Sequence, residues 1–440
     1  MGTGGRRVAA AVVAAILLIG VGVGIGLVIP GPVAQVTGVA TPEAQGPVAG
    51  GSTPAVPATS VPTRAPVATA TQTPVPTPTP TNTPAATPTA TPTPTPTNTP
   101  SPTPTPTPRI KPPPSAYKRL QDYPRPAGDS GYGFHINASP YPPDNEIMVY
   151  QVIPLLKDLG ATWVTVWVAD DNQVDRIKPL IDNGFEVVLR YHSQGSPPHP
   201  NYVPLQYQIE KYVKIGVHYF VTGNEPNLSN ENQGAGPDEI ARQWMMSADV
   251  VKFAGGIPLL YPMSPGGDLI SHRAMLIGIL EWLKKNDALD TLDGAGIAIH
   301  NRPHNKPLDL RNDDTAFLEY EWIDDLVKSY IGRSIPLIAT EAGYTVGEAR
   351  DPRFPRITED THRILNMEII FGFRDGRWRD SLFAQNFWIL GQFGYPDFLA
   401  DPWVFNPLYH GKDLPIVEQL KATPKFVRKF NEPGFVTKPR

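Results

Sequence analysis

Two glutamates that follow apolar stretches are the residues best suited to chemistry in this sequence. Glu225 comes directly after Asn224 at the end of the apolar run 219–222, and Glu341 ends a similar run at 335–340. An apolar, β-branched run that stops in a polar cluster is typical of a buried parallel strand whose carboxyl end delivers a side chain into a site. The sequence therefore predicts a pair of carboxylates, the groups that general acid–base chemistry uses.

The elements that must position these glutamates repeat along residues 128–440. Eight apolar runs alternate with eight amphipathic segments over roughly 310 residues, within the usual range for a (β/α)8 barrel. Open doubly wound sheets also alternate, but the count of eight and the missing glycine fingerprint after the first strand disfavour them. We therefore predict an α/β fold, a (β/α)8 TIM barrel. The predicted strands are 133–136, 162–168, 186–191, 219–222, 258–262, 294–299, 337–340 and 382–389, and the predicted helices are 146–159, 173–183, 204–215, 237–253, 272–285, 315–330, 359–371 and 414–420.

The carboxyl ends of all barrel strands face the same mouth, so the polar residues at those ends are expected to converge. They supply carboxylate, amide, imidazole and large aromatic groups, and the sequence has no Gly-x-Ser-x-Gly, His-Glu-x-x-His or phosphate-loop motif. There is no cysteine, and His300 with His304 lacks a third ligand, so we predict neither a metal nor a cofactor. The residues at the strand ends are His135, Asn137, Trp167, Asp170, Asp171, Arg190, His192, Asn224, Glu225, Tyr261, His300, Asn301, Glu341 and Trp388.

The pattern of these strand ends resembles a known family. Asn224-Glu225-Pro226 at the fourth predicted strand and Glu341 at the seventh resemble the (β/α)8 glycoside hydrolases of clan A. That clan includes the cellulase-like family 5 enzymes and many β-glycosidases. Asn-Glu-Pro alone is a short pattern, but its combination with Thr-Glu at strand seven and a tryptophan at strand eight is much more specific. The resemblance covers residues 128–440.

The resemblance implies a role for each matching residue. Glu225 matches the general acid/base, and Glu341 matches the nucleophile. Asn224 matches the amide that hydrogen-bonds the sugar 2-hydroxyl beside the nucleophile. Trp388 matches the aromatic floor under the sugar, and Arg190 resembles the arginine near the nucleophile.

The sixth strand departs from the family pattern. His300 stands where the family often has His-x-Tyr, but this chain has Arg302 in place of the tyrosine that contacts the nucleophile. Tyr261 and Tyr344 are the candidates to supply that contact. His135, at the first strand end, is a further candidate for substrate binding.

The implied function is a retaining glycoside hydrolase that cleaves the O-glycosidic bonds of a β-linked oligosaccharide or polysaccharide by double displacement. A retaining enzyme places its two carboxyl groups about 5–5.5 Å apart, whereas inversion needs about 6.5–9.5 Å. The alternative is a non-catalytic glycan-binding (β/α)8 surface protein, which the departure at Arg302 favours. A structural envelope protein is a third hypothesis.

The N-terminus predicts attachment to a membrane. Arg6 and Arg7 precede an uninterrupted apolar run at 8–29, whose 22 residues exceed the roughly 20 needed to cross a bilayer. A secretory signal has a shorter apolar core, so we predict an uncleaved signal anchor with residues 1–7 in the cytoplasm. Cleavage near Ala40, which would release a secreted protein, is the alternative.

Residues 30–127 predict a disordered, Pro/Thr-rich linker between the anchor and an extracytoplasmic barrel. Of the 53 prolines of the chain, 27 lie within residues 30–127, where the sequence reaches strict Thr-Pro alternation. Such a composition offers too little apolar surface for a core and favours a stiff, extended spacer. Residues 109–125 either pack against the domain or continue the tether. The net charge of −4, without a basic block after the N-terminus, argues against nucleic acid as a partner.

Overall fold

The computed structural model of this protein describes residues 109–191, 202–232, 234–391, 393, 400–407 and 410–435. The predicted cytoplasmic N-terminus, the anchor at 8–29 and the linker up to residue 108 lie outside the described residues, as does His192. None of the described helices has both the length and the apolar character that crossing a bilayer requires.

Eight parallel strands form a closed barrel in the order β1 to β8, with β8 pairing back onto β1. The predicted (β/α)8 fold is therefore confirmed, and each predicted strand overlaps an observed one. The strands are β1 (Tyr132–His135), β2 (Trp163–Val168), β3 (Glu186–Tyr191), β4 (Tyr219–Val221), β5 (Ile257–Leu260), β6 (Gly296–Asn301), β7 (Leu337–Ala342) and β8 (Leu382–Phe387).

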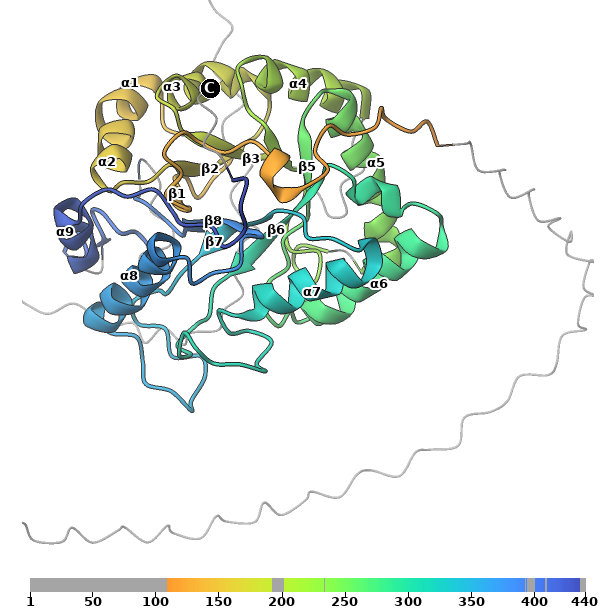
Figure 1. Ribbon diagram of the computed structural model, residues 1–440. Helices are drawn as coiled ribbons and strands as arrows, with labels where there is room; N and C mark the ends of the chain where they lie inside the picture. The colour runs from red at the N-terminus through yellow and green to blue at the C-terminus, as the bar shows by residue number, and fades with distance from the viewer. Residues whose placement is uncertain are drawn as a thin grey trace, which may run out of the picture. The chain divides into compact units, whose positions relative to one another are not determined.

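Helices follow the strands and surround the barrel (Figure 1). Capping residues fix several helix starts. The side chains of Ser271 and Thr358 accept hydrogen bonds from backbone N–H groups in the first turns of α6 and α8. The helices are α1 (Asn145–Ile147), α2 (Ile153–Asp158), α3 (Val174–Asp182), α4 (Tyr202–Lys214), α5 (Pro237–Phe253), α6 (His272–Lys285), α7 (Glu319–Ile331), α8 (Glu359–Asp375) and α9 (Pro415–Ala422), with a π-helix η2 (Met148–Val152) and short 3-10 turns η1 (Leu120–Asp122), η3 (Asp171–Gln173) and η4 (Leu289–Leu292).

Alternate residues of most strands pack into two separate cores. In β2, Val164 and Val166 belong to the outer core between the sheet and the helices, whereas Trp163 belongs to the inner core of the barrel. Val188 of β3 and Leu259 of β5 also lie in the inner core. This alternation is the expected result of the two-residue period of a strand in a closed barrel. It also determines which strand-end residues point into the mouth.

The segment before β1 closes the amino-terminal end of the barrel. Leu120 and Tyr123 pack in the inner core beside Trp163 and Tyr219, which begin β2 and β4. The Tyr123 hydroxyl donates a hydrogen bond to the carbonyl oxygen of Ala295 at 2.9 Å. Figure 1 shows this segment in orange. The base of the barrel is therefore filled by side chains that precede the first strand.

The start of this segment is fixed by charge. Arg109 donates to both carboxylate oxygens of Asp249 at 2.6 and 2.7 Å, and to Asp290 at 2.9 Å. Of the two alternatives for residues 109–125, packing against the domain is the one that the structure has. The barrel domain accordingly includes residues before 128, the predicted boundary.

Candidate active site

Glu225 follows β4 in a strained turn. Its backbone φ is +33°, in the left-handed region that a residue with a side chain rarely adopts. Such a conformation costs of the order of 1–3 kcal/mol and persists only where neighbouring contacts impose it. Here the Glu225 N–H donates to Pro262 at 3.0 Å, and its carbonyl oxygen accepts from Leu228 at 2.9 Å. A side chain on Gly223 would meet the Tyr261 ring at 2.8 Å, so the chain approaches β5 closely here.

Glu341 lies near the carboxyl end of β7 among cationic side chains. Arg190 of β3 donates from Nη1 to Glu341 Oε1 at 2.7 Å, and Arg302 Nη1 lies 3.8 Å from Oε2. The position of Glu341 beside β6 depends on a local irregularity. The pairing of β6 with β7 shifts between Ile299 and His300, and this shift places His300 opposite Glu341.

One imidazole lies between the two glutamates. His300 Nδ1 is 2.9 Å from Glu225 Oε1, and His300 Nε2 is 3.6 Å from Glu341 Oε1. One imidazole ring and its two contacts therefore lie between Glu225 Oε1 and Glu341 Oε1. These two oxygens are at most about 9 Å apart, which is the upper end of the range of carboxyl separations in glycosidases. The structure therefore brings together two glutamates that are far apart in the sequence.

The surroundings of Glu341 favour its ionised form. Burial raises the pKa of this carboxyl, but the charges of His300, Arg190 and Arg302 together outweigh burial and lower the pKa below its ordinary value. The side chain is only 13% exposed, so these interactions are weakly screened by water. Glu341 is consequently a carboxylate whose ionised form is stabilised at the mouth of the barrel.

Asn224 connects the two glutamates to a third carboxylate. Its Oδ1 accepts a hydrogen bond from Arg190 Nη2 at 2.8 Å. Its Nδ2 lies 3.4 Å from Glu225 Oε2 and 3.4 Å from Glu231 Oε1. Burial and the charge of Glu225 raise the pKa of Glu231, and these effects exceed the opposing ones of Asn224 and Arg190. The site is thus a connected polar network rather than an isolated pair.

His135 and Trp388 lie together beside this network. Their rings stack with centroids 4.6 Å apart and planes at 26°. Trp388 is 5% exposed, and the peptide bond that follows it is cis. His135 is fully buried, and burial, with the nearby charges of Arg190 and His300, lowers its pKa well below the ordinary value. A neutral imidazole therefore supports the tryptophan ring predicted to form the floor of the site.

The structure places Tyr261 and Tyr344 differently from the prediction. The Tyr261 hydroxyl lies 3.2 Å from Ser247 Oγ of α5, and the Tyr344 hydroxyl donates to the carbonyl oxygen of Lys306 at 2.9 Å. Both side chains are fully buried. Neither hydroxyl supplies the predicted contact with Glu341, because each is directed to another partner. Tyr261 and Tyr344 are therefore buried structural residues around the mouth.

Two residues of the site, Arg302 and Glu231, are not among the site residues predicted from the sequence. Arg302 takes the place beside Glu341 that was assigned to a tyrosine. Its Nη2 donates to Thr345 Oγ1 at 2.9 Å and lies 3.1 Å from Asp401 Oδ1. Arg302 therefore joins the loops that follow β6, β7 and β8 beside Glu341. The only sequence signal for it was its spacing two residues after His300.

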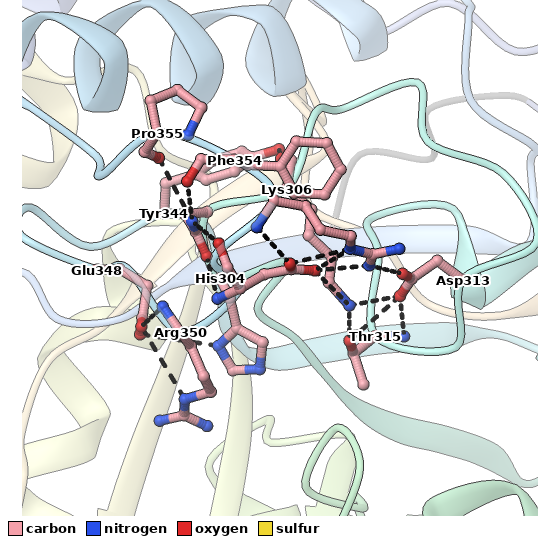
Figure 2. A network of polar contacts seen from close by, with 12 residues as sticks. His304, Lys306, Asp313, Thr315, Tyr344, Glu348, Arg350, Phe354 and Pro355 are labelled. Carbon is pink, nitrogen blue, oxygen red and sulfur yellow. Dashed lines mark hydrogen bonds and ion pairs between the residues drawn. The ribbon is translucent and has the colours of Figure 1, made fainter.

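A second polar network fixes two of these loops to each other. Figure 2 shows side chains of the loop after β6 and the loop after β7 pointing toward one another. Lys306 forms an ion pair with Asp313, and Arg353 reaches both Asp313 at 2.8 Å and Asp351 at 2.6 Å. His304 Nδ1 lies 3.7 Å from Glu348, which lowers the pKa of that carboxyl to about 2. The loops after β6 and β7 are therefore held together by ion pairs.

The described side chains contain no group of three or more His, Asp and Glu residues arranged to hold a metal ion. The imidazole of His304 faces Glu348 in the loop network, whereas that of His300 faces the two catalytic candidates. The chemistry available at the mouth is therefore that of carboxylates, imidazole and guanidinium groups. Asn224-Glu225 after β4 and Glu341 in β7 occupy the strand positions that the resemblance to clan A implies.

No protein-family model and no curated protein matches the chain. Among solved structures, the chain is similar to a family 51 α-L-arabinofuranosidase from Bifidobacterium longum, at 12% identity and a TM-score of 0.43 over 61% of this chain and 69% of that one. It is similar to a GH128 endo-β-1,3-glucanase from Sorangium cellulosum at 14% identity and a TM-score of 0.40, over 67% and 97% of the two chains. A GH5_18 protein from Streptomyces cattleya, solved with GlcNAc, has 13% identity and a TM-score of 0.44, over 68% and 82%.

Proposed function

We propose that this protein is a retaining glycoside hydrolase that cleaves the O-glycosidic bonds of a β-linked glycan. The observation that carries this proposal is the single imidazole of His300 between Glu225 and Glu341. The two carboxyl groups have opposite requirements in such a reaction, because one must hold a proton while the other must be ionised. The surroundings of Glu341 favour its ionised form, as the role of the nucleophile requires.

His300 supports the division through its two nitrogens. Its Nδ1 lies 2.9 Å from Glu225 Oε1, and its Nε2 lies 3.6 Å from Glu341 Oε1, so one ring contacts both carboxyl groups. The ionised Glu341 meets two guanidinium groups as well, at 2.7 Å from Arg190 and 3.8 Å from Arg302.

In the first half of the reaction, Glu225 gives its proton to the glycosidic oxygen as the bond from that oxygen to the anomeric carbon breaks. A carboxylate oxygen of Glu341 forms a bond to the same carbon, which leaves a glycosyl ester and an ionised Glu225. The leaving group departs as a neutral alcohol. Proton donation of this kind contributes about 10²–10⁴ in rate.

In the second half, the Glu225 carboxylate takes a proton from water while the water oxygen attacks the anomeric carbon. Glu341 leaves as a carboxylate, and the arginines stabilise the charge that returns to it. Glu225 ends the cycle protonated, as it began. Trp388, supported by His135, provides an apolar face under the sugar, and Asn224 provides an amide for a hydroxyl beside the reacting carbon.

We also propose that the reaction retains the configuration at the anomeric carbon. Inversion would place a water molecule between the nucleophilic carboxylate and the sugar, with carboxyl groups about 6.5–9.5 Å apart. The contacts of Glu341 with Arg190 on β3 and Arg302 after β6 favour its attack on carbon over a role as a base toward water. Proton NMR of the first-formed hydrolysis product distinguishes the two, because retention releases the β-anomer from a β-glycoside.

Hydrolysis of a panel of aryl β-glycosides tests the activity itself. We expect turnover by the unmodified protein, loss of turnover in Glu341→Gln, and a fall of about 10²–10⁴ in Glu225→Gln that is smaller for activated leaving groups. The non-catalytic alternative, a glycan-binding barrel, predicts no turnover together with glycan binding that survives Glu341→Gln. Arg302 is the feature of the sequence that favours this alternative. Its contacts with Glu341 and Asp401 count against the alternative, because they supply the proposed nucleophile with a partner.

We further propose that the apolar run 8–29 anchors the protein in the cell membrane and that the Pro/Thr-rich segment extends the barrel outward. The site would then meet polysaccharide or oligosaccharide outside the cytoplasm. In support, Arg109 joins the barrel at its base, near the end of α5, whereas the mouth lies at the opposite ends of the strands. Membrane fractionation of the full-length protein, compared with a variant lacking residues 8–29, tests the anchor.

A further inference from the structure

The side chain of Asn137 continues the pairing of β1 with β2 where the two strands separate. The last paired residues of these strands are His135 and Thr165. Two residues further on, Asn137 Nδ2 donates to the Trp167 carbonyl oxygen at 2.6 Å, and Asn137 Oδ1 accepts from the Trp167 N–H at 3.0 Å. Asn137 is only 5% exposed and also donates to the carbonyl oxygen of Ser139 at 2.5 Å. The backbone of Trp167 is therefore fixed by a buried side chain.

The side chains of Trp167 and Arg190 lie next to each other at the mouth of the barrel. Trp163 of β2 and Val188 of β3 belong to the inner core. Side chains alternate along a strand, so Trp167 and Arg190 also point inward, near the carboxyl ends of the same two strands. The two residues are partners in the pairing of β2 with β3, and Arg190 Cζ lies 5.4 Å from the centre of the Trp167 ring. This distance is within the range of about 6 Å over which an aromatic face attracts a guanidinium group.

Arg190 holds two groups of the proposed mechanism from this position. Its Nη1 donates to Glu341 Oε1 at 2.7 Å, and its Nη2 donates to Asn224 Oδ1 at 2.8 Å. The donors of a guanidinium are fixed in one plane, so both contacts depend on a single orientation of the arginine side chain. The side chains of Arg190 and Glu341 are only 7% and 13% exposed, so water screens their ion pair weakly. The Trp167 ring restricts the guanidinium and excludes water on the side that faces β2.

We propose that Asn137 and Trp167 are positioning residues for Arg190: the amide fixes the indole, and the indole holds the guanidinium in the orientation that contacts Glu341 and Asn224. This inference rests on the proposed glycosidase mechanism and adds to it two residues that act through Arg190. The consequence is twofold. Glu341 keeps the cation that favours its ionised form, and the Asn224 amide keeps its oxygen toward Arg190 and its nitrogen toward Glu225.

Loss of this support changes the pKa of Glu341 in a defined direction. Burial raises that pKa, and the charges of His300, Arg190 and Arg302 together lower it below its ordinary value. Water that enters beside Arg190 weakens both effects, so the pKa of Glu341 returns toward its ordinary value, which is a rise. The other charged or titratable groups of the site, which the substitutions below leave in place, are Glu225 and Glu231 after β4, Asp401 after β8 and His135 on β1.

The effect on Glu341 is measured without any substrate. Carbon-13 NMR of the full-length protein labelled at glutamate carboxyl groups follows the titration of Glu341, whose signal is identified by its loss in Glu341→Gln. In Trp167→Leu, which removes the ring and keeps an apolar side chain, the pKa of Glu341 is expected to rise by about half a unit. Trp167→Phe keeps an aromatic face and is expected to restore most of the difference. An unchanged titration in Trp167→Leu would overturn the proposal.

The role of Asn137 is tested in the same way. Asn137→Ala is expected to raise the pKa of Glu341 by less than Trp167→Leu does, because the ring remains but is no longer fixed. In the double variant the shift is expected to equal that of Trp167→Leu alone, since the amide acts through the ring. Two shifts that simply add would show that Asn137 acts by another route, and would overturn its role.

Asn305→Ala is the matched control. Asn305 is a buried asparagine that holds the backbone of Asp351 as Asn137 holds that of Trp167, donating to its carbonyl oxygen at 2.7 Å and accepting from its N–H at 2.8 Å. It joins the loops after β6 and β7 rather than β1 and β2. We expect the titration of Glu341 to be unchanged in this variant. A shift as large as that of Asn137→Ala would assign the effect to a general loosening of the mouth and would overturn the proposal.

Kinetics separate the proposal from the function on which it rests. Glu341 attacks only when ionised, so its higher pKa in Trp167→Leu is expected to move the acid limb of the pH profile of kcat/KM for an aryl β-glycoside about half a unit higher. A lower kcat/KM with the limb and the titration unchanged would assign Trp167 to sugar binding, overturning its role toward Arg190 and leaving the hydrolase standing. Absence of turnover in the unmodified protein counts against the hydrolase, and the NMR titration still decides the role of Trp167. Thermal unfolding of each variant establishes that it is folded.

Discussion

Replacing Arg302 by methionine removes one of the two guanidinium groups next to Glu341 and keeps a side chain of similar length. Arg302 Nη1 lies 3.8 Å from Glu341 Oε2. Burial alone raises the pKa of Glu341, and His300, Arg190 and Arg302 together lower it below its ordinary value. We therefore expect the pKa of Glu341 to rise in Arg302→Met.

The size of the rise follows from the distance and the surroundings. Two unit charges 3.8 Å apart interact by about 4 kcal/mol at an effective dielectric constant of 20 and by about 1 kcal/mol in bulk water. The Arg302 side chain is 26% exposed, and Asp401 lies 3.1 Å from its Nη2, which offsets part of its field at Glu341. The lower figure is therefore the better expectation, and about 1 kcal/mol corresponds to about 0.7 pKa unit.

The pH dependence of kcat/KM for an aryl β-glycoside measures this shift. Glu341 attacks only when ionised, so activity that depends on it is present above its pKa and lost as the pH falls through that value. A higher pKa moves the acid limb of the profile to higher pH, by about 0.7 unit. Arg302→Lys retains the charge and is expected to keep most of the limb in place.

Arg353→Met is the matched control for this experiment. Arg353 is an arginine of the loop after β7, and its partners Asp313 and Asp351 belong to the network of Figure 2 rather than to the glutamate pair. Loss of loop order would affect both variants, whereas loss of charge at Glu341 affects only the first. An acid limb that stays fixed in Arg302→Met, or moves to lower pH, would refute the electrostatic account of Glu341.

Three further substitutions test other parts of the site and fold. Trp388→Ala removes the ring stacked on His135, and we expect kcat/KM for aryl β-glycosides to fall about 100-fold, because the sugar loses the surface that orients it; unchanged kinetics would place the sugar elsewhere. Tyr261→Phe is expected to leave kcat/KM within about two-fold and to lower the free energy of unfolding in urea by about 1 kcal/mol, since its hydroxyl faces Ser247 rather than the mouth. Tyr123→Ala is expected to lower the free energy of unfolding by about 3–5 kcal/mol by opening the base of the barrel, and a loss below 1 kcal/mol would show that the base does not depend on this ring.

The positions of Glu225 and Glu341 could be predicted because two simple rules operate together. Buried parallel strands are continuous apolar runs, and the carboxyl ends of barrel strands share one mouth. A glutamate that directly follows such a run must therefore lie at that mouth. His300, Arg190 and Trp388 follow from the same rules, and the structure has all three beside the glutamate pair or the tryptophan floor.

Arg302 and Glu231 could not be predicted in the same way, because both lie in loops beyond the strand ends. A loop residue returns to the site only if the loop turns back, and the sequence does not specify that turn. The contact of Arg302 with Glu341 also depends on the register shift between β6 and β7 at Ile299 and His300. No periodic pattern records a shift of this kind.

Tyr261 and Tyr344 were assigned to substrate contact because they follow β5 and β7. A strand alternates its side chains with a period of two, so a change of one position turns a side chain from the mouth to the surrounding helices. The Tyr261 hydroxyl faces Ser247 of α5 for this reason, and that of Tyr344 faces the backbone of Lys306. The sequence predicted that these tyrosines lie near the carboxyl ends of β5 and β7, but not the direction in which their side chains point.

The segment before β1 illustrates a limit of composition. Residues 109–127 follow a long Pro/Thr-rich stretch, so composition alone extended the linker to residue 127. Leu120 and Tyr123 nevertheless complete the inner core at the base of the barrel. Two apolar side chains are enough for this, because the rest of that core is provided by the strands.

Covalent trapping tests the central claim most directly. The full-length protein is incubated with a panel of 2-deoxy-2-fluoro-β-glycosyl fluorides, which form the glycosyl ester quickly and release it slowly, and the labelled peptide is identified by mass spectrometry. We predict one glycosyl adduct per chain, on Glu341, that is absent in Glu341→Gln. An adduct on Glu225 or Glu231, or turnover of the matching aryl β-glycoside without any adduct, would contradict the assignment of Glu341 as the nucleophile.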